Sequence, residues 1–156
     1  MGKKTDKKIE TVTLQLLSMC GRNQVLSAKA KDVQDEFKRV ITVDRIVDNQ
    51  NHLMLNKVLH ATRAMDTGMR TFLELYNALP DSHSLGAYLI RLKRGKLNKF
   101  RQLNQGIAKR IQSGVVDKRN IYLHTSGRFP TKQEAEQLAD DAIAYLQTII
   151  NLAESI

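Results

Sequence analysis

Three polar residues in the six-residue stretch RNIYLH, namely Arg119, Asn120 and His124, have side chains suited to acid–base and phosphoryl chemistry. Cleaving RNA without a metal requires that a proton leave the 2′-hydroxyl and that another reach the departing 5′-oxygen. An imidazole that titrates near neutral pH is suited to this work. The charge that builds on the phosphoryl oxygens is stabilised by a guanidinium, which stays protonated and donates two parallel hydrogen bonds. We therefore predict that His124 transfers protons and that Arg119 stabilises the phosphoryl group.

The spacing of these residues indicates how they sit on a helix. Asn120 and His124 are four residues apart, so they share one helix face, where Asn120 can orient the imidazole or hold a phosphate oxygen. Arg119 and His124 are five residues apart and diverge by about 140° on an ideal helix. We therefore expect that one chain does not close the site alone. The alternative interpretation is structural, with Arg119 and His124 as cations at a helix end and Asn120 as a solvated group.

The sequence carries no motif of a metal or nucleotide site. It has no H-E-x-x-H motif, no E-x-x-H pair and no glycine-rich phosphate loop. Three further histidines show no ligand spacing with one another or with His124, and we interpret them as surface or helix-capping residues: His52, His60 and His83. We therefore expect neither a metal ion nor a cofactor.

The positive charge of the chain is concentrated in one region. The net charge is +9, and residues 91–130 hold eleven Lys and Arg residues against one acid, Asp117. A basic block of this size inside a folded region is typical of a face that binds a polyanion, most often nucleic acid. The alternative is an ordinary solvated helix face. The predicted RNA-binding residues are Arg91, Lys93, Arg94, Lys96, Lys99, Arg101, Lys109, Arg110 and Lys118.

Composition and cysteine content indicate the class of protein. Hydrophobic residues make up 42% and charged residues 26% of the 156 residues, and no apolar run approaches the roughly 18 residues of a membrane span. The start MGKKTDKKIE is charged where a signal peptide is apolar, so we expect neither export nor lipid anchoring. Cys20 is the single cysteine, which agrees with a reducing cytosol, and we expect it to be buried. The prediction is a cytoplasmic protein that does not enter a membrane.

Apolar residues recur at helical spacing along nearly the whole chain, and the two prolines, Pro80 and Pro130, fall where one periodic segment stops. Thr131 and Glu134 form a T-x-x-E capping box that starts the last helix. Gly95 interrupts or kinks the segment before it, and Gly114 ends or loosens that segment. The expected helical segments are 8–20, 24–50, 52–79, 85–111 with the break near Gly95, and the stretch after Thr131.

These segments predict an all-α fold class, namely an antiparallel four-helix bundle with an additional short N-terminal helix. The expected division is an N-terminal extension over residues 1–22 and a helical bundle over residues 23–156. The pattern does not indicate whether the first helix packs on the bundle or pairs with a partner.

The motif R-N-x-x-x-H formed by Arg119, Asn120 and His124 resembles the R-polar-x-x-x-H signature of the HEPN (higher eukaryote and prokaryote nucleotide-binding) superfamily. The residue match covers six positions, and the helix count and the place of the motif before the last helix extend the likeness loosely over residues 24–156. HEPN proteins are all-helical ribonucleases that include toxins of toxin–antitoxin systems and abortive-infection proteins. The resemblance implies a metal-independent endoribonuclease, a homodimer in which the motifs of two chains line one cleft, and, for a toxin, an antitoxin or inhibitor partner.

Two other functions stay open at this point. One is a non-catalytic helical module that binds nucleic acid or a protein through the basic 91–119 face, and the other is a structural dimerisation module. The sequence also departs from one HEPN toxin subfamily, which is paired with nucleotidyltransferase antitoxins and carries Tyr two residues after the histidine. This chain has Ser126 there. The resemblance therefore does not extend to control by modification of that tyrosine.

Overall fold

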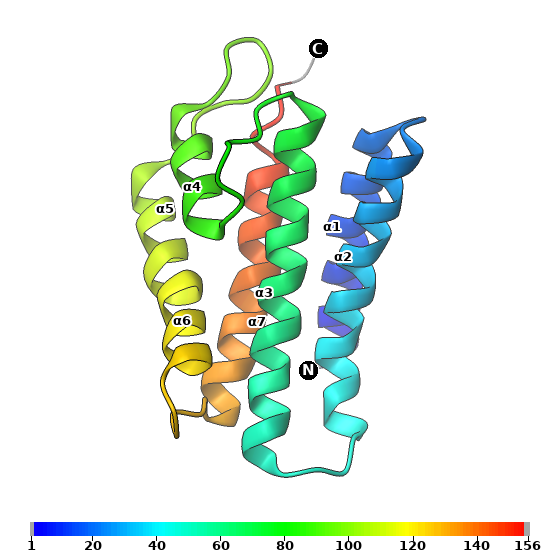
Figure 1. The fold of residues 1–156 in the computed structure, drawn as a ribbon. Coiled ribbons are helices and arrows are strands. Elements are labelled where there is room, and N and C mark those ends of the chain that lie inside the picture. The colour runs from blue at the N-terminus through cyan, green and yellow to red at the C-terminus, as the bar shows by residue number, and fades with distance from the viewer. Residues whose placement is uncertain (1, 155–156) are drawn as a thin grey trace.

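Helices make up most of the chain in the computed structural model, which describes residues 2–154 (Figure 1). Within this range β-type pairing is limited to two isolated bridges, Lys96 with Phe100 and Phe100 with Ala153. The predicted all-α fold class is therefore confirmed. In chain order the elements are α1 (Lys3–Cys20), α2 (Gln24–Thr42), the 3₁₀ turn η1 (Val43–Arg45), α3 (Gln50–Leu75), α4 (Leu85–Arg94), α5 (Gln105–Ile111), the π turn η2 (Gln112–Val116), α6 (Asp117–His124) and α7 (Lys132–Ile150).

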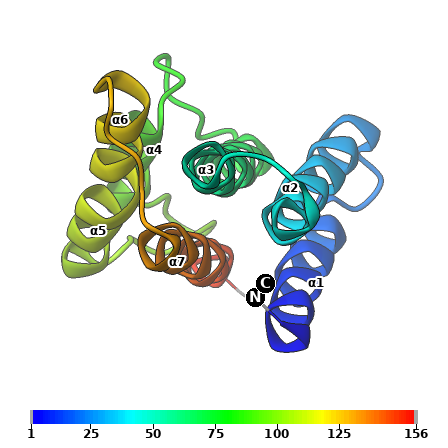
Figure 2. The same ribbon diagram turned by 90° about the horizontal axis from the view of Figure 1, so that it is seen from below.

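The helices form three layers, which are seen end-on in Figure 2. α3 and α7 pack against each other in the middle, α1 and α2 cover one side, and α4, α5 and α6 cover the other. α3 and α7 run in the same direction, while α2 and the α5–α6 segment run the opposite way (Figure 1). This arrangement places α6, which carries the motif, against α3 on the side away from α1.

The first helix is longer than the sequence indicates. α1 begins at Lys3 instead of residue 8, and it buries Ile9, Val12 and Leu16 at helical spacing. These side chains belong to the same hydrophobic core as those of α2 and α7. The predicted burial of Cys20 is confirmed, since this residue is 4% exposed at the end of α1. The N-terminal helix therefore packs on the bundle of this same chain.

α2 and α3 correspond to the helices predicted over 24–50 and 52–79, but both end earlier. α2 ends at Thr42, and Asn49 caps the start of α3 by accepting a hydrogen bond from the amide of Asn51 at 2.9 Å. α3 ends at Leu75, ahead of Pro80, because Asn77 takes a positive φ of 49° that no helix accommodates.

The predicted helical segment over 85–111 is broken by a long loop. α4 ends at Arg94, the following residue Gly95 has a φ of 65° that favours glycine, and residues 96–104 form no helix. Phe100 and Leu103 fit the helical pattern and are buried, but they lie in this loop and not in a helix. Leu97, which also fits the pattern, is 89% exposed. The helix expected over 85–111 is therefore absent over residues 96–104, because a loop that folds back onto the core also places apolar residues at intervals of three.

The loop over 96–104 is held by aromatic packing and by backbone pairing. The Phe100 ring packs edge-on against Phe72 of α3 at a centroid distance of 5.3 Å. The amide of Arg101 donates to the carbonyl of Leu152 at 2.8 Å, so the loop pairs with the segment that follows α7. The loop is therefore a fixed part of the fold.

A lysine is fully buried where α3, η1 and α7 meet. The ammonium of Lys57 lies 2.7 Å from Asp44 Oδ1 and 3.5 Å from Glu136 Oε1, and these two side chains are 36% and 29% exposed. Neither contact has the directions of a hydrogen bond, so within residues 2–154 the ammonium has ion-pair partners but no hydrogen-bond acceptor. A buried ammonium held in this way gains little over an apolar side chain of similar size, but it ties η1 and α7 to α3.

The last helix starts where the sequence predicts. Thr131 Oγ1 accepts a hydrogen bond from the amide of Glu134 at 3.1 Å, and the Glu134 carboxylate accepts one from the amide of Thr131 at 2.9 Å. The predicted capping box is confirmed. It fixes the point at which the chain leaves α6 and enters α7.

Candidate functional site

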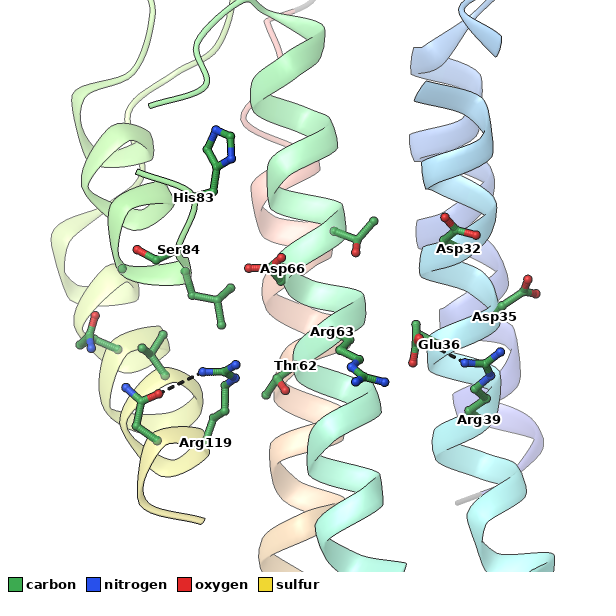
Figure 3. Close-up of a pocket in the computed structure, with 16 residues that line it drawn as sticks. Asp32, Asp35, Glu36, Arg39, Thr62, Arg63, Asp66, His83, Ser84 and Arg119 are labelled. Carbon is green, nitrogen blue, oxygen red and sulfur yellow. Dashed lines mark hydrogen bonds and ion pairs between the residues drawn. The ribbon is translucent and has the colours of Figure 1, made fainter. Parts of the chain in front are cut away.

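An open cleft of about 850 Å³ lies between α2, α3, the start of α4 and α6 (Figure 3). Its walls carry both signs of charge, together with one imidazole and several hydroxyl and amide groups. A cleft of this size accommodates a nucleotide-sized ligand. The ionisable residues that line it are Asp32, Asp35, Glu36, Arg39, Arg63, Asp66, His83 and Arg119.

Arg119 enters this cleft because of its place on the helix. α5, η2 and α6 follow one another without a break, and Ile111 and Val115 are fully buried in this rod. Arg119 comes four residues after Val115, so it continues the inward-facing stripe. Its guanidinium donates from Nη1 to Asn120 Oδ1 at 3.1 Å, and both side chains line the cleft.

The π turn η2 separates the part of this rod that packs on α4 from the part that carries the motif. Gly114 lies within η2, so the helix is loosened at this residue and does not end there. The side chain of Gln112 spans the turn by donating to Asp117 Oδ1 at 2.7 Å. A π turn holds one more residue than an α turn and is frequently found at functional sites.

His124 does not line the cleft. Tyr122 is the buried residue of α6, and burial raises the pKa of its phenol. His124 is the last residue of α6 and is exposed. The structure therefore brings Arg119 and Asn120 together and leaves His124 in different surroundings, which is the divergence that a five-residue spacing produces on a helix.

Asp66 on α3 is electrostatically coupled to two sides of the cleft. Burial raises the pKa of its half-buried carboxyl above the ordinary value, and the positive charges of Arg119, Arg70 and His83 oppose this effect without cancelling it. Arg119 belongs to α6 and His83 lies just before α4, so these two charges act on Asp66 from two sides of the cleft. Figure 3 shows the carboxyl of Asp66 between these two side chains.

Replacing Asp66 by Asn is expected to raise the free energy of unfolding at neutral pH. The folded-state pKa of Asp66 is raised, so the folded protein holds the proton more tightly than the unfolded chain does. Stability therefore falls as pH rises from the unfolded to the folded pKa, and an uncharged Asn avoids this loss. Urea unfolding should show a stabilised variant at pH 7 and no difference below the pKa of unfolded Asp. Equal stability at pH 7 would contradict the prediction, and Asp81→Asn, an exposed site outside the cleft, is the control.

The α2 wall of the cleft is organised by Glu36. Its carboxylate lies 2.7 Å from His60 Nδ1 on α3 and 3.3 Å from Arg39 Nη1. His60 was interpreted as a surface or capping residue, but it is half-buried and joins α2 to α3. His52 is exposed, with its ring centroid 6.3 Å from that of Phe129.

Part of the predicted basic face serves the fold. Arg91, Lys96 and Arg101 donate to backbone carbonyls, and Lys96 and Arg101 do so just after the ends of α3 and α7, where carbonyls lack helical partners. The other six predicted RNA-binding residues form no ion pair with the described part of the chain, and all but Lys118 are exposed: Lys93, Arg94, Lys99, Lys109, Arg110 and Lys118.

A groove of about 250 Å³ between α4 and α5 adjoins the cleft. Lys93 of α4 and Lys109 of α5 line it, together with Ile90, which is 52% exposed. Gly86 and Gln112 line both the groove and the cleft, so the two hollows meet at these residues. An extended anion bound in the cleft can therefore continue along two cations.

Sequence reasoning missed Asp66 and His83 as residues of the cleft. Asp66 lies directly after Met65 in α3, a helix with a largely apolar pattern. The only sign of a functional role in the sequence was the presence of a charged residue in a mostly buried helix. His83 precedes Ser84, the N-cap of α4, and therefore looks like part of a turn. Both come to line the same cleft as Arg119 only through the packing of α3 and α4 against the segment from α5 to α6, which no local pattern reports.

Among residues 2–154, no three His, Cys, Asp or Glu side chains are grouped so that they could hold a metal ion. In the same range, no helix combines the length and the apolar content needed to cross a membrane. Comparisons of the chain with family models, with curated proteins and with solved structures gave no match.

Proposed function

We propose that this chain is a metal-independent endoribonuclease of HEPN type that acts in the cytoplasm as a homodimer. The observation that supports this proposal most directly is that Arg119 and Asn120 line an open cleft of about 850 Å³. The adjoining groove supplies Lys93 and Lys109 for a continuing phosphate backbone. The R-N-x-x-x-H motif supports the reaction class, and the net charge of +9 supports a polyanionic substrate.

The proposed chemistry assigns one task to each motif residue. His124 removes the proton from the 2′-hydroxyl, and the 2′-oxygen attacks the phosphorus. The bond to the 5′-oxygen breaks, which leaves a 2′,3′-cyclic phosphate and a 5′-hydroxyl end. Arg119 stabilises the charge on the phosphoryl oxygens, and Asn120 orients its guanidinium through the 3.1 Å hydrogen bond. The need for a 2′-hydroxyl restricts cleavage to RNA.

In this proposal two protomers complete each site. Arg119 lines the cleft and His124 lies outside it, so a two-fold dimer in which the α6 helices face each other brings the imidazole of one chain to the guanidinium of the other. The exposed cations bind the RNA backbone without sequence preference, and this contribution weakens with salt. A role as a toxin or antiviral effector, controlled by an antitoxin or inhibitor protein, completes the proposal and follows from the family resemblance.

Incubating the purified protein with RNA in excess EDTA tests this function. We expect fragments with 2′,3′-cyclic phosphate ends by mass spectrometry, while DNA of the same sequence stays intact. The Arg119→Ala/His124→Ala double variant, purified in parallel, controls for a contaminating ribonuclease. RNA that is bound in a salt-dependent way but not cut would overturn the proposal in favour of a non-catalytic nucleic-acid-binding module. Neither binding nor cleavage would favour a structural dimerisation module.

A further inference from the structure

We infer that His83 is the general acid that protonates the leaving 5′-oxygen in this cleft. The inference rests on the proposed endoribonuclease activity and adds to it a residue outside the R-N-x-x-x-H motif. It starts from a gap in the chemistry of that motif. Transesterification needs a base at the 2′-hydroxyl and an acid at the departing oxygen, and each site of the proposed dimer receives one His124 imidazole for these two tasks.

Among the described residues, His83 is the imidazole that lines the same cleft as Arg119. His60 is occupied by Glu36 at 2.7 Å, and His52 lies beside Phe129 outside the cleft. Since Arg119 never gives up its proton at physiological pH, a proton donor beside it must be a different group. Within one chain His83 is the side chain of the cleft best suited to that role.

The backbone around His83 is fixed, and its ring is free. Ser84 is the N-cap of α4, and its hydroxyl accepts a hydrogen bond from the amide of Ala87 at 3.2 Å. Leu85, the first residue of α4, is buried. His83 itself is exposed and forms neither an ion pair nor a side-chain hydrogen bond with residues 2–154. Both ring nitrogens are therefore available to a substrate held in the cleft.

Asp66 links His83 to the phosphate-binding side of the cleft. The positive charges of both Arg119 and His83 act on its carboxyl, and Figure 3 shows Asp66 between the two side chains. A guanidinium for the phosphoryl group and an imidazole for the leaving oxygen thus lie on either side of one carboxylate.

The groove between α4 and α5 fits this assignment, because it meets the cleft at the start of α4, which directly follows the turn that carries His83. Gly86 lines both the groove and the cleft and follows His83 by three residues. The leaving strand, whose 5′-oxygen must meet the acid, can therefore run along the groove past Lys93 and Lys109. The attacked ribose then lies toward Arg119, where the phosphoryl group is held.

The proton balance of the step is complete without a metal. The 2′-oxygen forms its bond to phosphorus while its proton passes to His124. The bond between phosphorus and the 5′-oxygen breaks, the electron pair stays on that oxygen, and the His83 imidazolium supplies its proton. Water then returns a proton to His83 and removes one from His124, so the enzyme regains its starting state.

Two substrates that differ in their leaving group test the role of His83. The first is an oligoribonucleotide, whose 5′-oxygen must be protonated as it leaves. The second is a ribonucleoside 3′-(4-nitrophenyl phosphate), whose nitrophenolate leaves without a proton. We expect His83→Ala to lower kcat on the oligoribonucleotide by about 10²–10⁴-fold and to leave kcat on the aryl ester nearly unchanged. His52→Ala, an exposed histidine away from the cleft, should leave both rates unchanged.

Each result of this two-substrate test either supports or contradicts the role of His83 as general acid. Equal losses of kcat on the two substrates would overturn the inference, because they would show that His83 holds the structure or the phosphate. No loss on the oligoribonucleotide would overturn it as well, while leaving the endoribonuclease proposal intact. If the unmodified protein cuts neither substrate, the proposed function itself fails. His83→Gln, measured beside His83→Ala with circular dichroism of both, separates loss of the acid from loss of folding.

Discussion

Arg119→Ala and His124→Ala should each lower the rate of RNA cleavage by about 10²–10³-fold, while binding of RNA at low salt falls far less. Arg119 stabilises charge that develops only during the reaction, so its loss acts on kcat more than on affinity. Backbone binding comes mainly from other cations, since six of the nine predicted RNA-binding residues form neither an ion pair nor a side-chain hydrogen bond in the described chain, whereas Arg91, Lys96 and Arg101 donate to backbone carbonyls. Cleavage assays and filter binding with the same RNA measure the two effects.

Mixing the two inactive variants tests whether two chains share the site. If Arg119 of one chain works with His124 of the other, a heterodimer of Arg119→Ala and His124→Ala contains one intact site and one site that lacks both groups. Random exchange of subunits should then restore about a quarter of the wild-type activity. The structure motivates this expectation because Arg119 lines the cleft and His124 does not.

Two controls make the mixing experiment decisive. Arg128→Ala removes an exposed arginine four residues after the motif and should cut RNA at the wild-type rate. A mixture of the wild type with either inactive variant shows that the exchange treatment preserves activity. If that control stays active and the mixture of the two variants regains nothing, both groups act within one chain and the shared site is ruled out.

Asp44→Asn should lower the free energy of unfolding by about 2–3 kcal/mol. Removing one partner of a buried ion pair usually costs about 3–5 kcal/mol, because the remaining charge is left without compensation. Here the loss is smaller, since Glu136 stays 3.5 Å from the ammonium of Lys57. Urea unfolding followed by circular dichroism measures the change, and Asp48→Asn, in the same connection between α2 and α3 but with no contact to Lys57, is the matched control.

Asp44→Asn should change the free energy of unfolding very little in a variant that lacks the buried ammonium of Lys57. Lys57→Met keeps a long side chain in the core and removes an ammonium that has no hydrogen-bond acceptor in the described chain, so we expect the single variant to be as stable as the wild type or more stable. Asp44→Asn in the Lys57→Met background should then change the free energy of unfolding by less than about 0.5 kcal/mol. Equal losses in both backgrounds would show that Asp44 stabilises η1 by other contacts.

The parts of the fold that depend on local chemistry could be predicted from the sequence. The start of α7 at Thr131 and Glu134 was predictable, because a capping box is a contact between residues three apart. The loop over 96–104 was not, because Phe100 is buried by contact with Phe72 and by pairing with Ala153, both distant in sequence. The early start of α1 was hidden by its charged first turns, which a hydrophobic pattern does not register.

The candidate site divides in the same way. The divergence of Arg119 and His124 follows from helix geometry and could be stated from their spacing alone. The presence of Asp66 and His83 in the cleft that Arg119 lines depends on how several helices pack, so the sequence showed neither. The charge pattern also treats every cation as equally available. It could not show that the Lys96 ammonium donates hydrogen bonds to backbone carbonyls just after the end of α3.

The π turn η2 lets the segment between α5 and the motif lose one residue. A π turn holds one more residue than an α turn, and Gly114 lies within η2. Deleting Gly114 would therefore turn the segment from α5 to α6 into one regular α-helix and keep Arg119 on the inward stripe that it shares with Val115. A residue inserted into the regular turn between Asp117 and Arg119 would instead rotate Arg119 by about 100° away from the cleft, although every residue of the motif would be retained.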